Sequence, residues 1–465
     1  MTHPEPGVWD WRPWLVLALA LAAYANAFQG AYQFDDYRVI VDNPAVASVS
    51  AWWRDLPGIR PLLKLSYAVT GRLAPETRLF ALHATNVALH AINAILLLTV
   101  LRQLGAGRRV ADAAFIAALM FAAHPVHSEA VTYLSGRSVS LMALFYLLSI
   151  RAHLAGRTGL SLAAFLGALL VRETAITLPL ALLLIDRQRE PQADWRSLLF
   201  RGRWHWLLAG LGLLALFTLP YFRHLLAVSF QTRPVTDNLI TQAGAILYLM
   251  AQLLRPTGLN ADPVLPVFSD ASWRWAIQVI LLAGGLLWAL WRWLRRGPES
   301  GQGTSLWLAF GLLWFLLHLA PTNSLVPRLD VANERHLYLA AAGLYLALGY
   351  ALAGSRRGLA FGAGLALALT LATHARNQVY TTEVAYWQDV LQHEPANVRA
   401  LNNLGYAYAR ANMPEAALVC YDRGLSLAPG DFKLYFNRRA LCRTQASRLV
   451  GLCGETASER DAERP

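Results

Sequence analysis

Two adjacent carboxylates, Asp35 and Asp36, follow directly after the first long apolar segment of the chain. Such a pair is costly to desolvate at a membrane surface, so it either stays in water or has a task. One task is that of a general base, which takes the proton of an attacking hydroxyl. The plainer alternative is that the pair caps a loop or the start of a helix. By themselves the two residues favour the plainer alternative.

Further acids and cations lie in the stretches between apolar segments. With the topology derived below, one side of a membrane collects Asp35, Asp36, Arg60, His124, His127, Glu129, Arg137, Arg172, Glu173, Glu334, Arg335 and His336. A transferase that uses a sugar on a lipid phosphate needs both kinds of residue. A carboxylate deprotonates the acceptor hydroxyl, and Arg or His neutralises the charge on the departing phosphate. Each residue alone is explained equally well by pairing that braces the loops, whereas the collection favours a site.

Several of the histidines fall into two groups, one within an apolar segment and one in an outer loop. The second apolar segment carries polar residues on one face of a helix, namely His83, Asn86, His90 and Asn93. Hydrogen bonding between helices is their favoured role, and only His83, nearest the outer end, is kept as a supporting site residue. His124, His127 and Glu129 suggest metal ligands, but Pro125 interrupts any helix that would present them together. We therefore predict no metal site and no required cofactor, and leave a need for a divalent metal open.

The composition is that of an all-α polytopic membrane protein. Of 465 residues, 56% are hydrophobic and only 15% are charged, which is too apolar for an ordinary soluble domain. The net charge of +12 does not indicate a nucleic-acid partner, because most Arg residues lie in short loops where positive charge sets orientation. Lysine occurs only at Lys64 and Lys433, which suggests a GC-rich bacterial genome. The three cysteines lack metal-ligand spacing and predict no disulfide framework.

About eleven to twelve apolar segments cross the membrane in this interpretation. They cover residues 13–31, 79–104, 110–123, 138–154, 160–171, 174–185, 204–226, 273–294, 306–319, 337–353 and 359–374, with 239–254 undecided. The first is interpreted as an uncleaved signal anchor rather than a signal peptide. The basic stretches 102–109 and 186–203 indicate the cytoplasmic side. If 239–254 is a re-entrant or surface helix, the later basic loops are also cytoplasmic, eleven crossings result and the chain ends outside.

Three regions follow from this pattern. Residues 1–375 form the membrane domain, in which the outer loop 32–78 holds the acidic pair and short helices along the membrane surface. Residues 376–443 have the spacing of a tetratricopeptide repeat, with one complete repeat between two half repeats. So short an array cannot form an independent solenoid, so we expect it to pack on the membrane domain. Residues 444–465 are polar, and we predict that they are disordered.

Eight short motifs recur in a characteristic order. They are Phe34-Asp35-Asp36, Arg60-Pro61-Leu62, His83-x-x-Asn86-x-x-x-His90, His124-Pro125-Val126-His127-Ser128-Glu129-Ala130-Val131, Ser135-Gly136-Arg137, Arg172-Glu173-Thr174-Ala175, Ala320-Pro321-Thr322-Asn323 and Glu334-Arg335-x-x-Tyr338. As a set they resemble the transmembrane and tetratricopeptide-repeat O-mannosyltransferase family, of the GT-C class of glycosyltransferases. The resemblance covers about residues 10–435, and the ordered set is far more specific than any single motif.

The resemblance implies an inverting transferase that moves a sugar from a polyprenyl or dolichyl phosphate to a hydroxyl. It implies mannose as the sugar and Ser or Thr of a secreted or membrane protein as the acceptor. It further implies a bacterial inner membrane protein with its site and its repeat on the periplasmic side. The roles that follow are Asp35 as base, with Asp36 and Glu129 as further acids, Arg60, Arg137, Arg172 and Arg335 on the donor phosphate, and His83, His124, His127, Glu173, Glu334 and His336 in support.

Two departures from the family pattern keep alternatives open. Arg172 stands where relatives commonly have Lys, which preserves a phosphate contact but changes its geometry. The repeat array is much shorter than in animal members, so another sugar or acceptor is realistic. A non-enzymatic scaffold that binds partners through the repeat is one alternative, although it would not need acids and Arg residues in several outer loops. A transporter of lipid-linked glycans is another, although only residues 79–104 carry a clear polar face.

Overall fold

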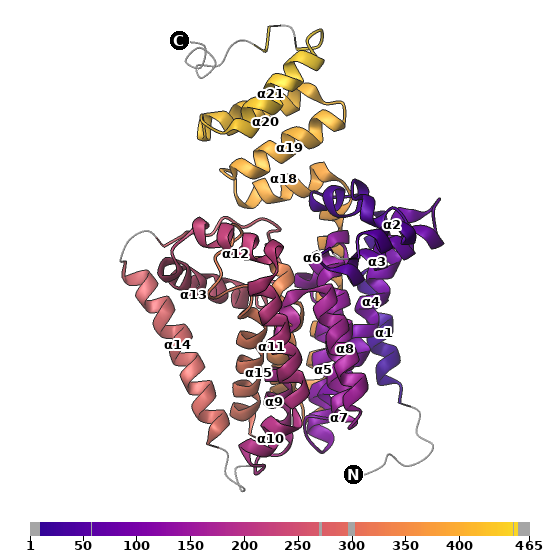
Figure 1. Cartoon of the computed structure of the whole chain (residues 1–465), viewed down its shortest axis with the longest axis vertical. Coiled ribbons are helices and arrows are strands. Elements are labelled where there is room, and N and C mark those ends of the chain that lie inside the picture. Colours follow the sequence, from indigo (N-terminus) through magenta and orange to yellow (C-terminus); the bar gives the residue numbers. More distant parts are fainter. Residues whose placement is uncertain (1–9, 57, 269–271, 296–302, 450, 454–465) are drawn as a thin grey trace.

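The computed structural model describes residues 10–56, 58–268, 272–295, 303–449 and 451–453. Every regular element in these ranges is a helix, which confirms the all-α prediction. A bundle of apolar helices forms most of the molecule, and the C-terminal helices stand on one end of it (Figure 1). The acidic loop after the first helix lies at that same end.

Most bundle helices run along the long axis of the molecule (Figure 1). They include α1 (Arg12–Ala23), α4 (Arg78–Leu101), α5 (Arg108–Ala123), α7 (Arg137–Leu154), α8 (Thr158–Val171), α9 (Leu178–Arg189), α11 (Arg203–Thr218), α14 (Trp273–Leu294) and α15 (Thr304–Leu319). Two further helices, α16 (Leu337–Leu352) and α17 (Arg356–Asn377), pack against α5. Other helices occupy the bundle ends, namely α2 (Val49–Arg54), α3 (Pro61–Leu73), α6 (Ser128–Val131), α10 (Trp195–Arg201), α12 (Pro220–Thr232) and α13 (Val235–Gln252).

Small residues allow α15 and α16 to approach closely. A Cβ atom added to Gly311 would lie 2.4 Å from the carbonyl oxygen of Gly343, and one added to Gly343 would meet the side chain of Trp314. No larger residue fits either position, which is the close packing that membrane helices use in place of a hydrophobic driving force. This contact fixes the start of α16, directly after the site residues Glu334 to His336.

The helices have the length and composition of membrane spans. Among the described residues, three helices are long and apolar enough to cross a membrane, namely Arg78–Leu101, Trp273–Leu294 and Arg356–Tyr380, or up to five if two bent helix pairs each count as one span. Together these helices indicate a membrane protein, while the count of about eleven crossings stays a prediction. Helix α13, which covers most of the undecided segment 239–254, lies across the long axis near the bundle end (Figure 1). That residues 239–254 form a re-entrant or surface helix stays a prediction.

The C-terminal helices form the predicted repeat. They are α18 (Glu383–His393), α19 (Val398–Arg410), α20 (Pro414–Leu427) and α21 (Phe432–Thr444). Three begin at side-chain caps, because Thr382, Asn397 and Asp431 each accept a hydrogen bond from a backbone N–H of the first turn. Gly405 of α19 allows close packing on α20, because an added Cβ would lie 2.5 Å from the ring of Tyr421.

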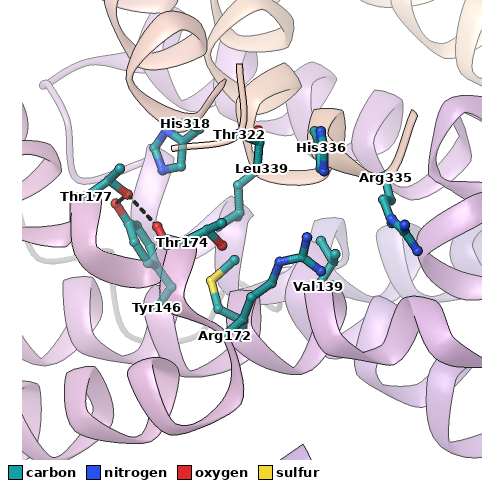
Figure 2. Close-up of a pocket in the computed structure, with 11 residues that line it drawn as sticks. Val139, Tyr146, Arg172, Thr174, Thr177, His318, Thr322, Arg335, His336 and Leu339 are labelled. Atoms are coloured by element: carbon teal, nitrogen blue, oxygen red, sulfur yellow. Dashed lines mark hydrogen bonds between the residues drawn. The ribbon is translucent and has the colours of Figure 1, made fainter. Parts of the chain in front are cut away.

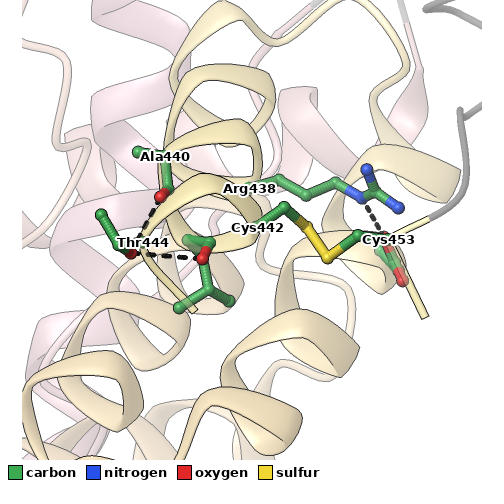
Figure 3. Close-up of a disulfide and its surroundings, with 7 residues drawn as sticks. Arg438, Ala440, Cys442, Thr444 and Cys453 are labelled. Carbon is green, nitrogen blue, oxygen red and sulfur yellow. Dashed lines mark hydrogen bonds and ion pairs between the residues drawn. A yellow bond between two sulfur atoms is a disulfide. The ribbon is translucent and has the colours of Figure 1, made fainter. Parts of the chain in front are cut away.

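The end of the chain differs from its predicted disorder. Cys442 and Cys453 form a disulfide, contrary to the sequence-based expectation (Figure 3). Leu449 is 1% exposed and packs in a cluster that includes Leu425 and Leu441. The physical reason is that α20 and α21 end the array and leave an apolar edge, which this segment covers. Residues 454–465 lie outside the described part of the chain.

Candidate active site

Asp36 is the structural member of the acidic pair. Its side chain is fully buried, and one carboxylate oxygen accepts a 2.9 Å hydrogen bond from the backbone N–H of Gln33. The other oxygen accepts hydrogen bonds from the backbone N–H and the hydroxyl of Ser135, at 2.8 and 2.5 Å. Burial raises the pKa of Asp36 to about 7 in spite of these hydrogen bonds. For Asp36 the contacts favour the plainer role, which is to hold the loop.

Asp35 occupies a different environment. Its side chain is partly exposed and lines a pocket, while its backbone N–H donates a 3.0 Å hydrogen bond to the hydroxyl of Tyr133. The preceding residue, Phe34, has a φ of 32°, a left-handed conformation that is strained for a bulky side chain. The turn at Phe34 leaves the carboxylate of Asp35 at the pocket, where it can meet a substrate. It directs the carboxylate of Asp36 into the protein.

The pocket at Asp35, called the acidic pocket below, lies between the membrane domain and the repeat. Its walls come from the first outer loop, α6, the segments before α14 and α16, and helices α18 and α19. The lining residues are Phe34, Asp35, Glu129, Tyr133, Ala261, Asp262, Asp330, Asn333, Arg335, Tyr386, Trp387 and Arg399. Aromatic rings beside carboxylates can hold a polar ligand that carries hydroxyl groups. Because Asp35 is one of its lining residues, the acidic pocket is suited to a hydroxyl-bearing acceptor.

A second pocket, called the basic pocket below, lies next to it in the membrane domain (Figure 2). It is lined by Val139, Met142, Tyr146, Arg172, Thr174, Thr177, His318, Thr322, Arg335, His336 and Leu339, and no acid is among them. Figure 2 shows Arg172 reaching from one wall toward His336 and Arg335 on the other. Both ring nitrogens of His336 are buried without a hydrogen-bond partner. Buried polar atoms without partners are costly, so this pocket is suited to an anion such as a phosphate.

Arg335 lines both pockets, and Glu129 holds it there. One carboxylate oxygen of Glu129 accepts a 2.8 Å hydrogen bond from the backbone N–H of Arg335, and the other lies 3.5 Å from its Nε atom. Both side chains are largely buried, at 15% and 4% exposure for Arg335 and Glu129. The acid therefore has a positioning role, and the guanidinium lies between the two pockets.

The predicted phosphate contacts Arg60 and Arg137 lie outside both pockets. Arg60 makes a two-pronged ion pair with Glu173, with Nη2–Oε1 and Nε–Oε2 distances of 2.7 and 3.2 Å. Burial alone would raise the pKa of Glu173, but Arg60 and Arg172 outweigh it and lower this pKa to about 2. Arg137 is fully buried and donates to Asn86, at 2.7 Å, and to the carbonyl of Leu82, at 2.9 Å. Arg60 therefore joins the start of α3 to the turn that follows α8, and Arg137 joins the start of α7 to α4.

Four further predicted residues are also placed away from the pockets. His83 hydrogen-bonds the carbonyl oxygen of Gly30 at 3.0 Å, and His124 that of Leu253 at 3.2 Å. His127 is buried among aromatic rings, including that of Phe121. Glu334 accepts a 2.8 Å hydrogen bond from the backbone N–H of Asn260, and burial raises its pKa to about 8. Within the described residues, no group of three or more His, Cys, Asp or Glu residues could hold a metal ion.

Several pocket residues were missed by the sequence analysis. Asp330 is an acid in the predicted outer loop 321–336, so the rule that selected the other outer-loop acids could also have selected Asp330. Tyr386, Trp387 and Arg399 belong to the repeat and reach the acidic pocket only because α18 and α19 pack on the membrane domain. His318 lies inside an apolar helix, where no charged neighbour marks it.

The fold defines an all-α membrane protein with a tetratricopeptide segment, and two adjacent pockets lie where its outer loops meet. Residues 398–431 match the family model described as Tetratricopeptide repeat. The chain is 32% identical to Protein O-mannosyl-transferase TMTC4 of Mus musculus, over 32% of this chain and 24% of that protein. It is 27% identical to Protein O-mannosyl-transferase F38B6.6 of Caenorhabditis elegans, over 36% of this chain and 27% of that protein.

A third relative is Protein O-mannosyl-transferase Tmtc2 of Drosophila melanogaster, 31% identical over 37% of this chain and 21% of that protein. The aligned part of the chain thus spans about a quarter of the length of these curated relatives. No solved structure matches the chain. These relatives confirm the resemblance inferred from the ordered motifs, and the activity of this chain is taken up below.

Proposed function

We propose that the chain is a membrane glycosyltransferase that moves mannose from a polyprenyl or dolichyl phosphate to a Ser or Thr hydroxyl of a protein. One observation carries the proposal, which is that Arg335 joins a basic pocket suited to a phosphate to an acidic pocket that contains Asp35. The reaction needs these two environments at adjacent positions. The names of the relatives support the transfer of mannose to protein.

In this proposal Asp35 accepts the proton of the acceptor hydroxyl as the oxygen attacks the anomeric carbon. The bond from that carbon to the phosphate oxygen breaks, and the lipid phosphate leaves with the electron pair. Arg335, Arg172 and His336 line the pocket where this negative charge grows. The two guanidinium groups stabilise it as fixed cations, and the ring N–H of His336 is a further hydrogen-bond donor. A single displacement of this kind inverts the configuration at the anomeric carbon. Asp36 and Glu129 position the loop and Arg335.

We further propose that both pockets face the outside of a bacterial inner membrane. The repeat and α3 of the first outer loop lie at one end of the bundle, while α10 lies at the other (Figure 1). The acidic pocket takes its walls from both the first outer loop and the repeat, and it shares Arg335 with the basic pocket. Helix α10 carries Arg196 and Arg201. Positive loops favour the cytoplasm, so the end with α10 is assigned to the cytoplasm. The disulfide between Cys442 and Cys453 supports the same orientation, because disulfides persist in oxidising compartments such as the periplasm.

The test is transfer by the purified protein from polyprenyl-phosphate mannose to a set of Ser- and Thr-containing peptides, read by mass spectrometry. Asp35→Asn should lower the rate by roughly 100-fold or more, the usual effect of removing a general base. Asp42→Asn, at an exposed acid of the same loop, is the matched control and should keep the rate. Near-normal transfer by Asp35→Asn would remove Asp35 from catalysis. Failure with every lipid-phosphate sugar would favour the scaffold or transporter alternatives.

A further inference from the structure

A third pocket lies far from the site, at the other end of the hairpin formed by α7 and α8. It is lined by Phe145, Leu148, Arg151, Ala152, Ala155, Arg157, Leu160, Ala163 and Ala164. No acidic residue is among them, and apart from the two arginines the lining is apolar. Small alanine side chains leave a groove between the helices beside the larger Phe145 and Leu148. Leu160 is 57% exposed, as expected of a surface that faces lipid.

The two arginines of this groove have no partner among the described residues. Arg151 ends α7 and Arg157 precedes α8, both are exposed, and neither side chain makes a hydrogen bond or ion pair with the described chain. Some other arginines at the same end do have partners. Arg189 donates to the carbonyl of Gln103 at 2.9 Å, and Arg201 pairs with Glu190 at 2.8 Å. Two free guanidinium groups thus stand at the mouth of an apolar groove.

We propose that one anionic phospholipid binds here, with its phosphate at Arg151 and Arg157 and an acyl chain in the groove. The apolar lining matches the chain, and the paired cations match the headgroup. This end of the bundle carries the basic loops, so it meets the leaflet whose anionic lipids such arginines attract. A zwitterionic lipid offers the same chain but no net charge, so it should bind more weakly.

Binding at this position would act on the hairpin that carries part of the basic pocket. The far end of α7 contributes Val139 and Tyr146 to that pocket, and α8 ends immediately before Arg172. A lipid that holds the two helices together at the inner end would also limit their movement at the outer end. The lipid site itself rests on the groove and its arginines alone, so it stands whether or not the chain transfers mannose.

The test uses the full-length protein in a non-ionic detergent, with phosphatidylglycerol or phosphatidylcholine added. Bound lipid is counted by native mass spectrometry, and the thermal unfolding midpoint is followed in parallel. The variant Arg151→Gln with Arg157→Gln removes both charges. The matched control, Arg356→Gln with Arg357→Gln, removes two exposed charges outside the groove, in the first turn of α17.

We expect the natural protein and the control variant to retain phosphatidylglycerol and to be stabilised by it more than by phosphatidylcholine. The groove variant should bind phosphatidylglycerol about tenfold more weakly or worse, because each headgroup contact with Arg is lost. Ala163→Trp keeps both arginines and fills the groove, so it should also lose the lipid. Equal binding of the two lipids, or full retention of phosphatidylglycerol by the groove variant or by Ala163→Trp, would overturn the proposal.

Discussion

At the scale of single residues, two neighbouring carboxylates have opposite surroundings. Asp36 accepts three hydrogen bonds inside the protein, whereas Asp35 lines the acidic pocket. A general base must reach the proton that it removes, so only Asp35 is placed for that role. Asp36 instead ties the loop to Ser135, and through it to the segment that follows α6. Replacing the two residues should therefore give different defects, one in rate and one in stability.

The pH dependence of stability tests the assignment of Asp36. Burial raises the pKa of Asp36 to about 7, against about 3.9 in an unfolded chain. The folded state thus holds this proton more tightly, so the contribution is fully present below about pH 4 and is lost as the pH rises through 7. We expect the difference in unfolding midpoint between the natural protein and Asp36→Asn to fall between about pH 4 and pH 8. A difference that stays constant over this range would contradict the burial of a titrating carboxylate.

Arg335 should act mainly on the donor. Its guanidinium lines the basic pocket, and charged hydrogen bonds to phosphate contribute more than neutral ones. Arg335→Ala should lower kcat/KM for polyprenyl-phosphate mannose by about tenfold to 100-fold. Arg335→Lys should recover part of the loss, because it keeps the charge but not the planar donor geometry. Arg38→Ala, at an exposed residue of the first outer loop, is the control, and an unchanged donor response of Arg335→Ala would exclude a phosphate contact.

At the scale of elements, the repeat is attached to the membrane domain by several separate contacts. Arg399 of α19 hydrogen-bonds Asp262 and Asp330, and Arg376 at the end of α17 pairs with Asp389 of α18. The first outer loop is joined as well, because the ring of Phe34 packs against a ring of α18 at a centroid distance of 5.4 Å. A solenoid of so few helices needs such support. The contacts also make the repeat one wall of the acidic pocket.

Loosening this wall should affect the acceptor more than the donor. Arg399→Ala removes the hydrogen bonds to Asp262 and Asp330, and within the described part of the chain neither carboxylate has another ion-pair partner. We expect the KM for the peptide acceptor to rise by about tenfold, comparable to the loss of one charge-assisted contact, with the donor KM unchanged. Steady-state kinetics with each substrate varied in turn measures the split. The control is Arg439→Ala on the exposed surface of α21, and equal changes in both KM values would count against an acceptor wall.

At the scale of the whole molecule, local patterns and long-range packing differ in how far they can be predicted. Apolar segments, the repeat spacing and the outer-loop motifs are local. They predicted helices, the repeat and five residues that line the pockets, namely Asp35, Glu129, Arg172, Arg335 and His336. The partners of Arg137 and the contact of Trp387 with the first outer loop join segments far apart in sequence, so no local pattern contains them. The composition likewise did not predict that Cys442 pairs with Cys453 at the end of the chain.

The orientation of the chain gives the last prediction. Three exposed residues serve as probes: Glu76 between α3 and α4, Ser426 in α20, and Gln192 between α9 and α10. Helices α3 and α20 lie toward the end of the molecule that carries the repeat, and α10 lies at the opposite end (Figure 1). If residues 239–254 do not cross, the number of crossings is odd, and Glu76 and Ser426 share the outer side. In a Cys420→Ser background, a membrane-impermeant maleimide added to intact spheroplasts should then label Glu76→Cys and Ser426→Cys, but not Gln192→Cys.

A permeant maleimide should label all three positions and serves as the control for reactivity, while the remaining cysteines are paired in the disulfide. If 239–254 crosses, every later segment changes side, so Ser426→Cys would be protected together with Gln192→Cys. That outcome would separate the repeat from Asp35 by the thickness of the membrane and would be incompatible with the acidic pocket, whose walls come from both. One labelling experiment therefore tests the crossing count and the shared site, because the pocket can exist only if the number of crossings between its walls is even.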